Sequence, residues 1–264
     1  MKKSKRIGST ALMILLVLFF YAPILYTVIF SFNDSRSLTK LAGFSLQWYS
    51  KMLNDRTMME AVFYTIATAV LATVISTVVG TVTAIGLSKS RKVMKNIVSQ
   101  INDLPIMNPE IVTAIGLLML YSAVHFRKGF VTMLLAHIMF CTPYVILSIM
   151  PKLRTLDPNL ADAAMDLGAT PFQTLVKVIV PQVRPGIISG ALIAFTMSFD
   201  DFVISYFVTG NGVSNISIIV YTMSKRINPS INALSTLIIV IISVFLLISN
   251  IIPVLTQRKG KSKD

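Results

Sequence analysis

The chain has 264 residues, of which 54% are hydrophobic and 13% are charged, and its mean hydropathy is +0.74. A soluble domain of this length cannot enclose so much apolar side chain in one core, so the composition indicates a protein that faces lipid. The net charge of +13 does not indicate nucleic-acid binding, because the basic residues lie in short groups between apolar runs. A single cysteine, Cys141, excludes an intrachain disulfide and a cysteine-based metal site.

Six apolar runs are long enough to cross about 30 Å of hydrocarbon. In chain order they cover about residues 8–32, 61–88, 98–124, 129–150, 185–208 and 232–256. The first run is too long for the apolar part of a signal peptide and no small-x-small cleavage site follows it, so we expect an uncleaved span. The sequence therefore predicts an all-α membrane protein with six transmembrane helices in a single domain, 1–264.

The distribution of Lys and Arg predicts the orientation of these spans. The two ends of the chain and the segments 89–95 and 151–184 together hold 16 of the 24 Lys and Arg residues, and the alternate loops hold the other 8. Cytoplasmic loops carry the excess of positive charge in membrane proteins. We therefore expect both termini and the loop 151–184 on the cytoplasmic side, as an even number of spans requires.

The loop 151–184 reads as two short soluble helices. Asp157-Pro158 is typical of a helix start, and Gly168 is typical of a helix end. A second start follows at Thr170-Pro171, where Gln173 completes a capping box, and Pro181 is expected to end this helix. Two helices are more than a connection between neighbouring spans needs, so the pattern indicates a docking element for a cytoplasmic partner.

This loop resembles the EAA loop of the membrane subunits of bacterial ABC importers. The family pattern is E-A-A, three residues, G, nine residues and then I-x-L-P, and its spacing is matched throughout. The matching residues are Asp162, Ala163, Ala164, Gly168, Val178, Val180 and Pro181. The resemblance implies a type I importer permease whose loop docks on the ATPase subunit, with Asp162, Ala163, Ala164, Gly168 and Pro181 as its ATPase-coupling residues. The substitutions Asp for Glu and Val for Ile and Leu remove neither the cap nor the turn.

Three further stretches are similar to the spermidine/putrescine permeases of this family. They read "SFNDSRS…GFSLQWYSKML", "LPIMNPEIVTAIGLL" and "SFDDFVISYFVTG". The resemblance implies a polyamine substrate, an ATPase pair, a second and non-identical membrane subunit, an extracytoplasmic binding protein and a place in the bacterial cytoplasmic membrane. Thiamine or ferric iron, which related permeases carry, is the alternative substrate.

The chain itself lacks the signature of an ATPase. Its end, "KGKSKD", imitates part of a phosphate-binding loop, but the required glycine position is Leu255. We therefore expect no enzymatic activity and no cofactor in this chain, with ATP and Mg bound by the partner ATPase.

Three carboxylates interrupt the apolar stretches at about 104–124 and 185–208, and a carboxylate at membrane depth is a candidate functional group. Glu110 follows Pro105 and Pro109, which are expected to break the third span, and Asp200 and Asp201 lie in the fifth. A polyamine needs carboxylates with aromatic faces between them. The predicted substrate pathway is Glu110, Phe199, Asp200, Asp201, Phe202 and Tyr206.

On one continuous helix, Asp200 and Asp201 point about 100° apart. Asp201 shares a stripe of small and polar residues with Gly190, Ala194, Ser198 and Ser205, so we expect it at the pathway or at the subunit interface. Asp200 is expected to pair with a neighbouring subunit. The alternative is that all three carboxylates are structural and bind backbone or serine groups between helices.

Two other classes of protein fit less well. An intramembrane aspartyl protease needs two Asp on different helices that share a proton, and the sequence has neither H-E-x-x-H nor G-x-S-x-G. A stand-alone channel would not need the docking loop. For His125 and His137 we expect loop and packing roles.

Overall fold

The computed structural model describes residues 2–37, 39–224 and 228–244, and these form helices with one isolated β-bridge between Asn33 and Phe44. The chain divides into two compact units, Met1–Met59 with Val220–Asp264, and Glu60–Ile219. Four helices are long and apolar enough to span a membrane, and a bent helix pair makes a fifth candidate. The predicted sixth span, 232–256, lies only partly within the described residues. Its described part belongs to a helix that covers Ser230–Val244. The count of six spans stays a prediction.

The first unit contains α1 (Lys2–Ser31), α2 (Gln47–Asn54) and the helix Ser230–Val244. Asn33 organises the loop that follows α1, since its side-chain amide donates to the carbonyl of Lys40 and its side-chain oxygen accepts from the backbone of Ala42. Trp48 of α2 is buried, and its indole N–H donates to the carbonyl of Asn33 at 2.6 Å. These bonds join the start of the loop to α2.

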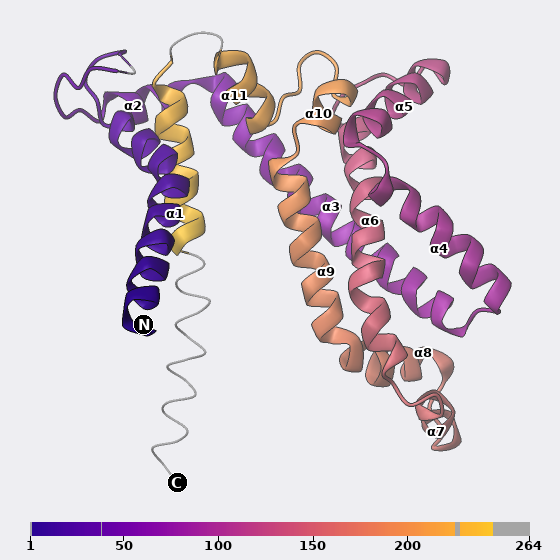
Figure 1. The fold of residues 1–264 in the computed structure, drawn as a ribbon. Helices are drawn as coiled ribbons and strands as arrows, with labels where there is room; N and C mark the ends of the chain where they lie inside the picture. Colours follow the sequence, from indigo (N-terminus) through magenta and orange to yellow (C-terminus); the bar gives the residue numbers. More distant parts are fainter. Residues whose placement is uncertain (1, 38, 225–227, 245–264) are drawn as a thin grey trace. The chain divides into compact units, whose positions relative to one another are not determined.

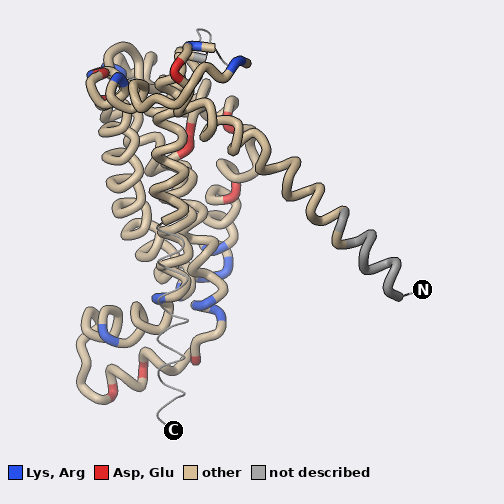
Figure 2. The backbone as a smooth tube through the Cα atoms, turned by 90° about the vertical axis from the view of Figure 1, so that its left-hand side faces the viewer, with Lys and Arg blue, Asp and Glu red and all other residues tan. Residues whose placement is uncertain are grey.

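The second unit is a layer of long helices. It contains most of α3 (Arg56–Lys89), then α4 (Lys92–Met107), α5 (Glu110–Ala123), α6 (Phe130–Arg154), α9 (Val180–Asp200) and α10 (Val203–Val208). Figure 2 shows Lys and Arg grouped toward the ends of these helices, with the stretch between them almost free of positive charge. The predicted third span, 98–124, is in fact two helices bent by 106°, with the break at Asn108 and Pro109 and with Pro105 inside α4.

Helices α6 and α9 approach each other closely because α9 presents a stripe of small residues, as is usual where membrane helices pack. This stripe consists of Gly186, Gly190, Ala194 and Ser198, all buried. A Cβ atom at Gly186 would lie 2.9 Å from the backbone oxygen of Ser148, and one at Gly190 would lie 3.1 Å from the Cα of Val145. The two backbones are therefore in direct contact, and the pair forms the centre of the unit.

We expect Gly186→Ala to destabilise the protein by about 1–3 kcal/mol, because the new methyl group meets backbone atoms that cannot move independently. Gly116→Ala is the matched control, since a Cβ atom there meets nothing within 4 Å. The fraction of monodisperse protein that survives heating in detergent measures the effect. Equal losses for the two variants would contradict the close packing.

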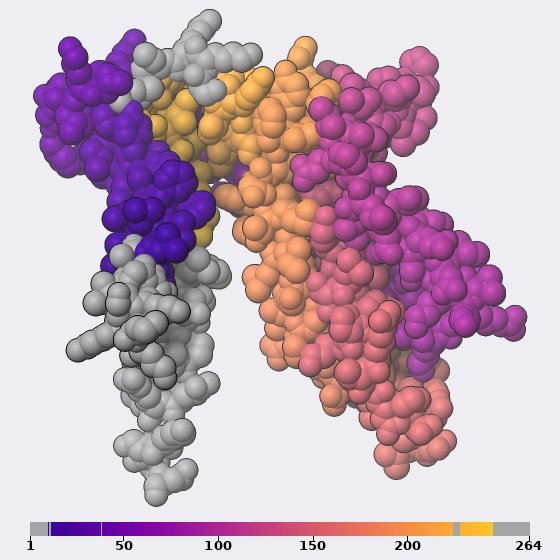
Figure 3. Space-filling model, viewed as in Figure 1, coloured from indigo at the N-terminus to yellow at the C-terminus, as the bar shows by residue number. Residues whose placement is uncertain are grey.

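The loop between α6 and α9 contains α7 (Leu160–Asp166) and α8 (Pro171–Thr174) and protrudes at one end of the unit (Figures 1 and 3). Its predicted limits, 151–184, are wrong at both ends. Helix α6 continues to Arg154, and α8 runs through a π-helical segment, Leu175–Ile179, directly into α9. The apolar helix is thus continuous over Pro171–Asp200.

Pro181 was expected to end the second loop helix, and it does not. The backbone N–H of Val180 donates to the carbonyl of Leu175, five residues back, which is the wider π turn. Proline normally breaks a helix because it lacks an N–H and its ring clashes with the carbonyl four residues earlier. The wide turn before Pro181 rearranges those carbonyls, so the helix passes through the proline. Helices α8 and α9 are therefore parts of one continuous helical segment.

Candidate functional sites: the helices between α6 and α9 and the α9–α10 break

The turn between α7 and α8 is built by local sequence signals. Gly168 adopts φ +88°, a conformation that favours glycine, and its N–H donates to the carbonyl of Met165. The predicted capping box is confirmed, since the Thr170 hydroxyl accepts from the N–H of Gln173 and the Gln173 side chain accepts from the N–H of Thr170. The first helix begins later than predicted. Asn159 is its N-cap, and Asp157 accepts from the backbone of Asn159.

The tip of the loop exposes apolar side chains. Leu167 is 90% exposed and Phe172 is 72% exposed. Of the five residues expected to couple to an ATPase, Asp162, Ala163, Gly168 and Pro181 are exposed and Ala164 is half-buried. Ala161, by contrast, is buried against the rest of the unit. The loop thus has one face toward its own chain and one open face.

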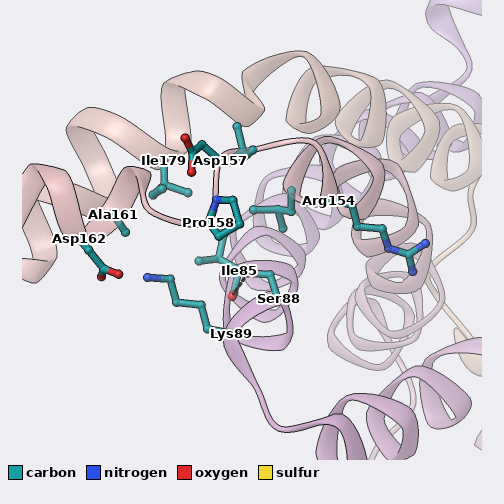
Figure 4. A pocket seen from close by; sticks show the side chains of 11 residues that line it. Ile85, Ser88, Lys89, Arg154, Asp157, Pro158, Ala161, Asp162 and Ile179 are labelled. Carbon is teal, nitrogen blue, oxygen red and sulfur yellow. Dashed lines mark hydrogen bonds between the residues drawn. The ribbon is translucent and has the colours of Figure 1, made fainter.

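A pocket of about 450 Å³ lies between the loop and the end of α3. Ile85, Ser88 and Lys89 line it from α3, and the α6 end, the turn at Asp157 and helix α7 close it. Figure 4 shows the Lys89 ammonium group and the Asp162 carboxylate pointing toward one another across this pocket. The loop therefore lies next to the end of α3 and also continues into α9.

Asp200 and Asp201 do not lie on one continuous helix, as the sequence had led us to expect. Helix α9 ends at Asp200, and Asp201 is extended, with φ −60° and ψ 128°. The Asp201 carboxylate then accepts from the backbone N–H groups of Ile204 and Ser205, at 3.3 and 2.8 Å. It therefore caps the start of α10. The side chain is only 8% exposed, which matches the structural alternative left open for Asp201.

His137 of α6 lies against this break. Its Nδ1 is 2.7 Å from the hydroxyl of Ser198, and its Nε2 is 2.9 Å from the hydroxyl of Ser205 and 3.4 Å from the Asp201 carboxylate. Asn215 donates to the carbonyl of Asp201 and to the Ser205 hydroxyl. A packing role was expected for His137, and this bonding was missed. A histidine in an apolar run was the sequence signal, but it could not name partners about sixty residues away.

The other two carboxylates face outward. Asp200 and Glu110 are exposed, and no hydrogen bond or ion pair to another residue involves either carboxylate in the described part of the chain. Glu110 begins α5 and lies within electrostatic reach of Tyr144 on α6. No contact among the described residues joins it to Asp200.

Aromatic rings accompany Asp200. Phe199 stacks on Phe195, and Phe202 packs against Tyr206, which is 48% exposed. The segment thus carries an exposed carboxylate and an exposed aromatic ring, two kinds of group that suit an organic cation. Among the described residues, no cluster of three or more His, Cys, Asp or Glu side chains could hold a metal ion.

Curated proteins similar to this chain are transport permeases. The chain is 39% identical over 229 residues to the putrescine transport system permease protein PotI of Escherichia coli (strain K12), covering 84% of this chain and 82% of that protein. It is 36% identical over 243 residues to the spermidine/putrescine transport system permease protein PotC of Haemophilus influenzae, covering 92% and 95%. PotC of E. coli (strain K12) is 34% identical over 247 residues.

A solved structure shares the fold. It is a crystal structure of a bacterial ABC transporter involved in the import of the acidic polysaccharide alginate, and one chain aligns with a TM-score of 0.69 at 17% identity, covering 94% of this chain and 96% of that one. The family described as the inner membrane component of binding-protein-dependent transport systems matches residues 76–260. The resemblance found in the loop between α6 and α9 is thereby confirmed, and the chain belongs to this family of inner-membrane transport permeases, which are not enzymes.

Proposed function

We propose that this chain is one membrane subunit of an ATP-driven importer of polyamines and forms half of the translocation pathway. The observation that carries this proposal is the exposed Asp200 carboxylate at a helix break, with Phe199 and the exposed Tyr206 near it in the sequence, in a chain similar to permeases of putrescine and spermidine. A polyamine carries ammonium groups separated by methylenes. Carboxylates compensate the charge, and aromatic faces hold an ammonium group that has left water.

Glu110 supports the same substrate class. It is exposed at the start of α5, next to a break between two helices, and broken helices at membrane depth tend to line cavities. Asp200 and Glu110 thus offer two carboxylates that are not neutralised within the described part of the chain. Two carboxylates suit a polyamine, which carries several ammonium groups, better than thiamine, which carries one fixed positive charge. Ferric iron prefers several oxygen ligands held together, and the described residues hold no cluster of three or more His, Cys, Asp or Glu side chains.

The partners follow from the loop between α6 and α9. Its open face presents Leu167 and Phe172, and apolar side chains exposed together mark a protein contact. We propose that this face docks on a cytoplasmic ATPase, which binds ATP and Mg, and that α8 passes its movement to α9. A second, non-identical membrane subunit would complete the pathway, and an external binding protein would deliver the substrate.

The proposed location is the bacterial cytoplasmic membrane, with both termini in the cytoplasm. The excess of Lys and Arg in the loop between α6 and α9 and at the two chain ends supports this orientation. The basic C-terminal segment lies outside the described residues.

Uptake of radiolabelled spermidine and putrescine by cells with and without this chain tests the proposal. We expect uptake to be lost on deletion and restored by the wild-type chain, provided that the ATPase, the second membrane subunit and the binding protein are present. Unchanged polyamine uptake would refute the substrate assignment. Loss of thiamine or ferric-iron uptake in its place would assign the permease to the alternative cargo.

A further inference from the structure

The break between α9 and α10 is held from both sides by one imidazole. His137 contacts Ser198 in the last turn of α9 and Ser205 in the first turn of α10. Its two ring nitrogens lie on opposite edges of the ring, which is why a single side chain reaches both helix ends. The break is therefore fixed to α6 at one point.

The remaining polar groups at the break are satisfied by the same set of residues. We call His137, Ser198, Asp201, Ser205 and Asn215 the His137 cluster. Each of its members is at least nine-tenths buried, and Asn215 also accepts from the backbone N–H of Ile218 at the start of α11 (Ile216–Ser224). Leaving one such group without a partner costs about 1–3 kcal/mol. The cluster therefore favours one geometry of the break.

The geometry of the break determines the relative positions of the exposed side chains on its two sides. On an unbroken helix, positions 200 and 202 would lie about 200° apart around the axis. At the break, their relation is set by the backbone angles of Asp201, given above, and of Phe202, with φ −112° and ψ −48°. The positions of the Asp200 carboxylate and of the Phe202–Tyr206 pair thus depend on the cluster.

We propose that the His137 cluster is a positioning device for the substrate pathway. It holds the α9–α10 break so that Asp200 on one side and the aromatic pair Phe202–Tyr206 on the other meet a cation at a fixed spacing. His137 is the central positioning residue, because it bonds to both helices from a third. This inference rests on the proposed transport of polyamines.

The test compares uptake kinetics of diamines of increasing chain length by the complete importer carrying wild-type chain, His137→Ala, His137→Gln or Ser198→Ala. Cys141→Ala is the matched control, since Cys141 lies one turn along α6 and bonds the α9 carbonyl of Ala194 without touching the break. We expect His137→Ala to raise KM about ten- to a hundredfold, the scale of one lost hydrogen bond to a charged group. The rise should differ between diamine lengths, because the spacing of the contacts changes.

Partial rescue by His137→Gln is expected, since its amide offers both a donor and an acceptor. Ser198→Ala removes only the hydrogen bond to His137. It therefore tests the same cluster even if His137→Ala fails to fold. If KM stays unchanged for every diamine while the maximal rate falls in proportion to the amount of protein in the membrane, the cluster is structural only and the inference is overturned.

A second readout does not depend on the substrate. Because Cys141 is the single cysteine, Cys141→Ala gives a thiol-free background for Asp200→Cys. We expect added His137→Ala to change the rate of alkylation at position 200 by a membrane-impermeant maleimide several-fold, and equal rates would overturn the inference. If the wild type takes up no polyamine, the proposed function fails, and this readout still decides whether the cluster positions residue 200.

Discussion

A chain with Gly168→Pro is expected to enter the membrane in normal amounts and yet to lose substrate uptake. The turn between α7 and α8 needs φ +88° at this position, and proline is fixed near −65°. Proline also removes the N–H that donates to Met165. The two loop helices then cannot form their hairpin, and the open face with Leu167 and Phe172 is lost. Uptake and ATP hydrolysis stimulated by the binding protein should both fall to background.

Gly168→Ala is the graded control for this variant. A Cβ atom at residue 168 meets nothing within 4 Å, so alanine brings only the strain of a left-handed conformation, about 1–2 kcal/mol. The alanine variant should therefore retain much of the uptake. Full uptake by the proline variant, at equal amounts in the membrane, would show that the hairpin is not needed for coupling.

The features that the sequence predicted well are those that depend on neighbouring residues. The Thr170–Gln173 capping box and the glycine turn at Gly168 involve contacts over three or four positions, and both were found. The stripe of Gly190, Ala194 and Ser198 is likewise a matter of helical spacing, but it is buried against α6 of the same chain, whereas the pathway or the subunit interface was expected for Asp201 on this stripe.

The features that were predicted wrongly depend on how local rules compete with the surrounding structure. Pro181 is a strong stop signal by itself, but the π-helical turn at Leu175–Ile179 lets the helix continue. At Asp201, by contrast, a helix ends where the sequence had predicted that it would continue. Neither proline nor glycine marks this helix end in the sequence. The break is instead stabilised by hydrogen bonds of His137 and Asn215, which are distant in the sequence.

The candidate carboxylates show the same limit. A charged residue in an apolar run can be found from sequence, and Glu110, Asp200 and Asp201 were all identified. Which of them turns inward cannot be found from sequence. The assumption of a straight helix favoured Asp201 for the pathway, whereas the structure directs its carboxylate into the chain and leaves Asp200 exposed. The pathway assignments stay predictions, and we now place Asp200 first among them.

The variants Asp200→Asn and Asp201→Asn compare the roles of these two neighbouring carboxylates directly. Asp200→Asn is expected to lower polyamine uptake about ten- to a hundredfold, as the loss of a charged contact to an ammonium group would. The amount and thermal stability of the protein should be unchanged, because no other side chain among the described residues bonds to this carboxylate. Asp201→Asn should lower stability as well, since it weakens the cap on α10 and the contact with His137, and as a member of the His137 cluster it should raise KM only through the altered break. Uptake kinetics and heating in detergent separate the two effects.

Two further variants make the comparison decisive. Asp103→Asn, a half-buried carboxylate of α4 in the same unit, controls for the change from carboxylate to amide and should leave KM unaltered. Asp200→Glu keeps the charge and should recover part of the uptake, because a flexible polycation tolerates a small displacement of one contact better than its loss. If Asp200→Asn transports as the wild type does and Asp201→Asn alone raises KM, the buried residue carries the substrate. The break between α9 and α10 would then have to open during transport to expose it.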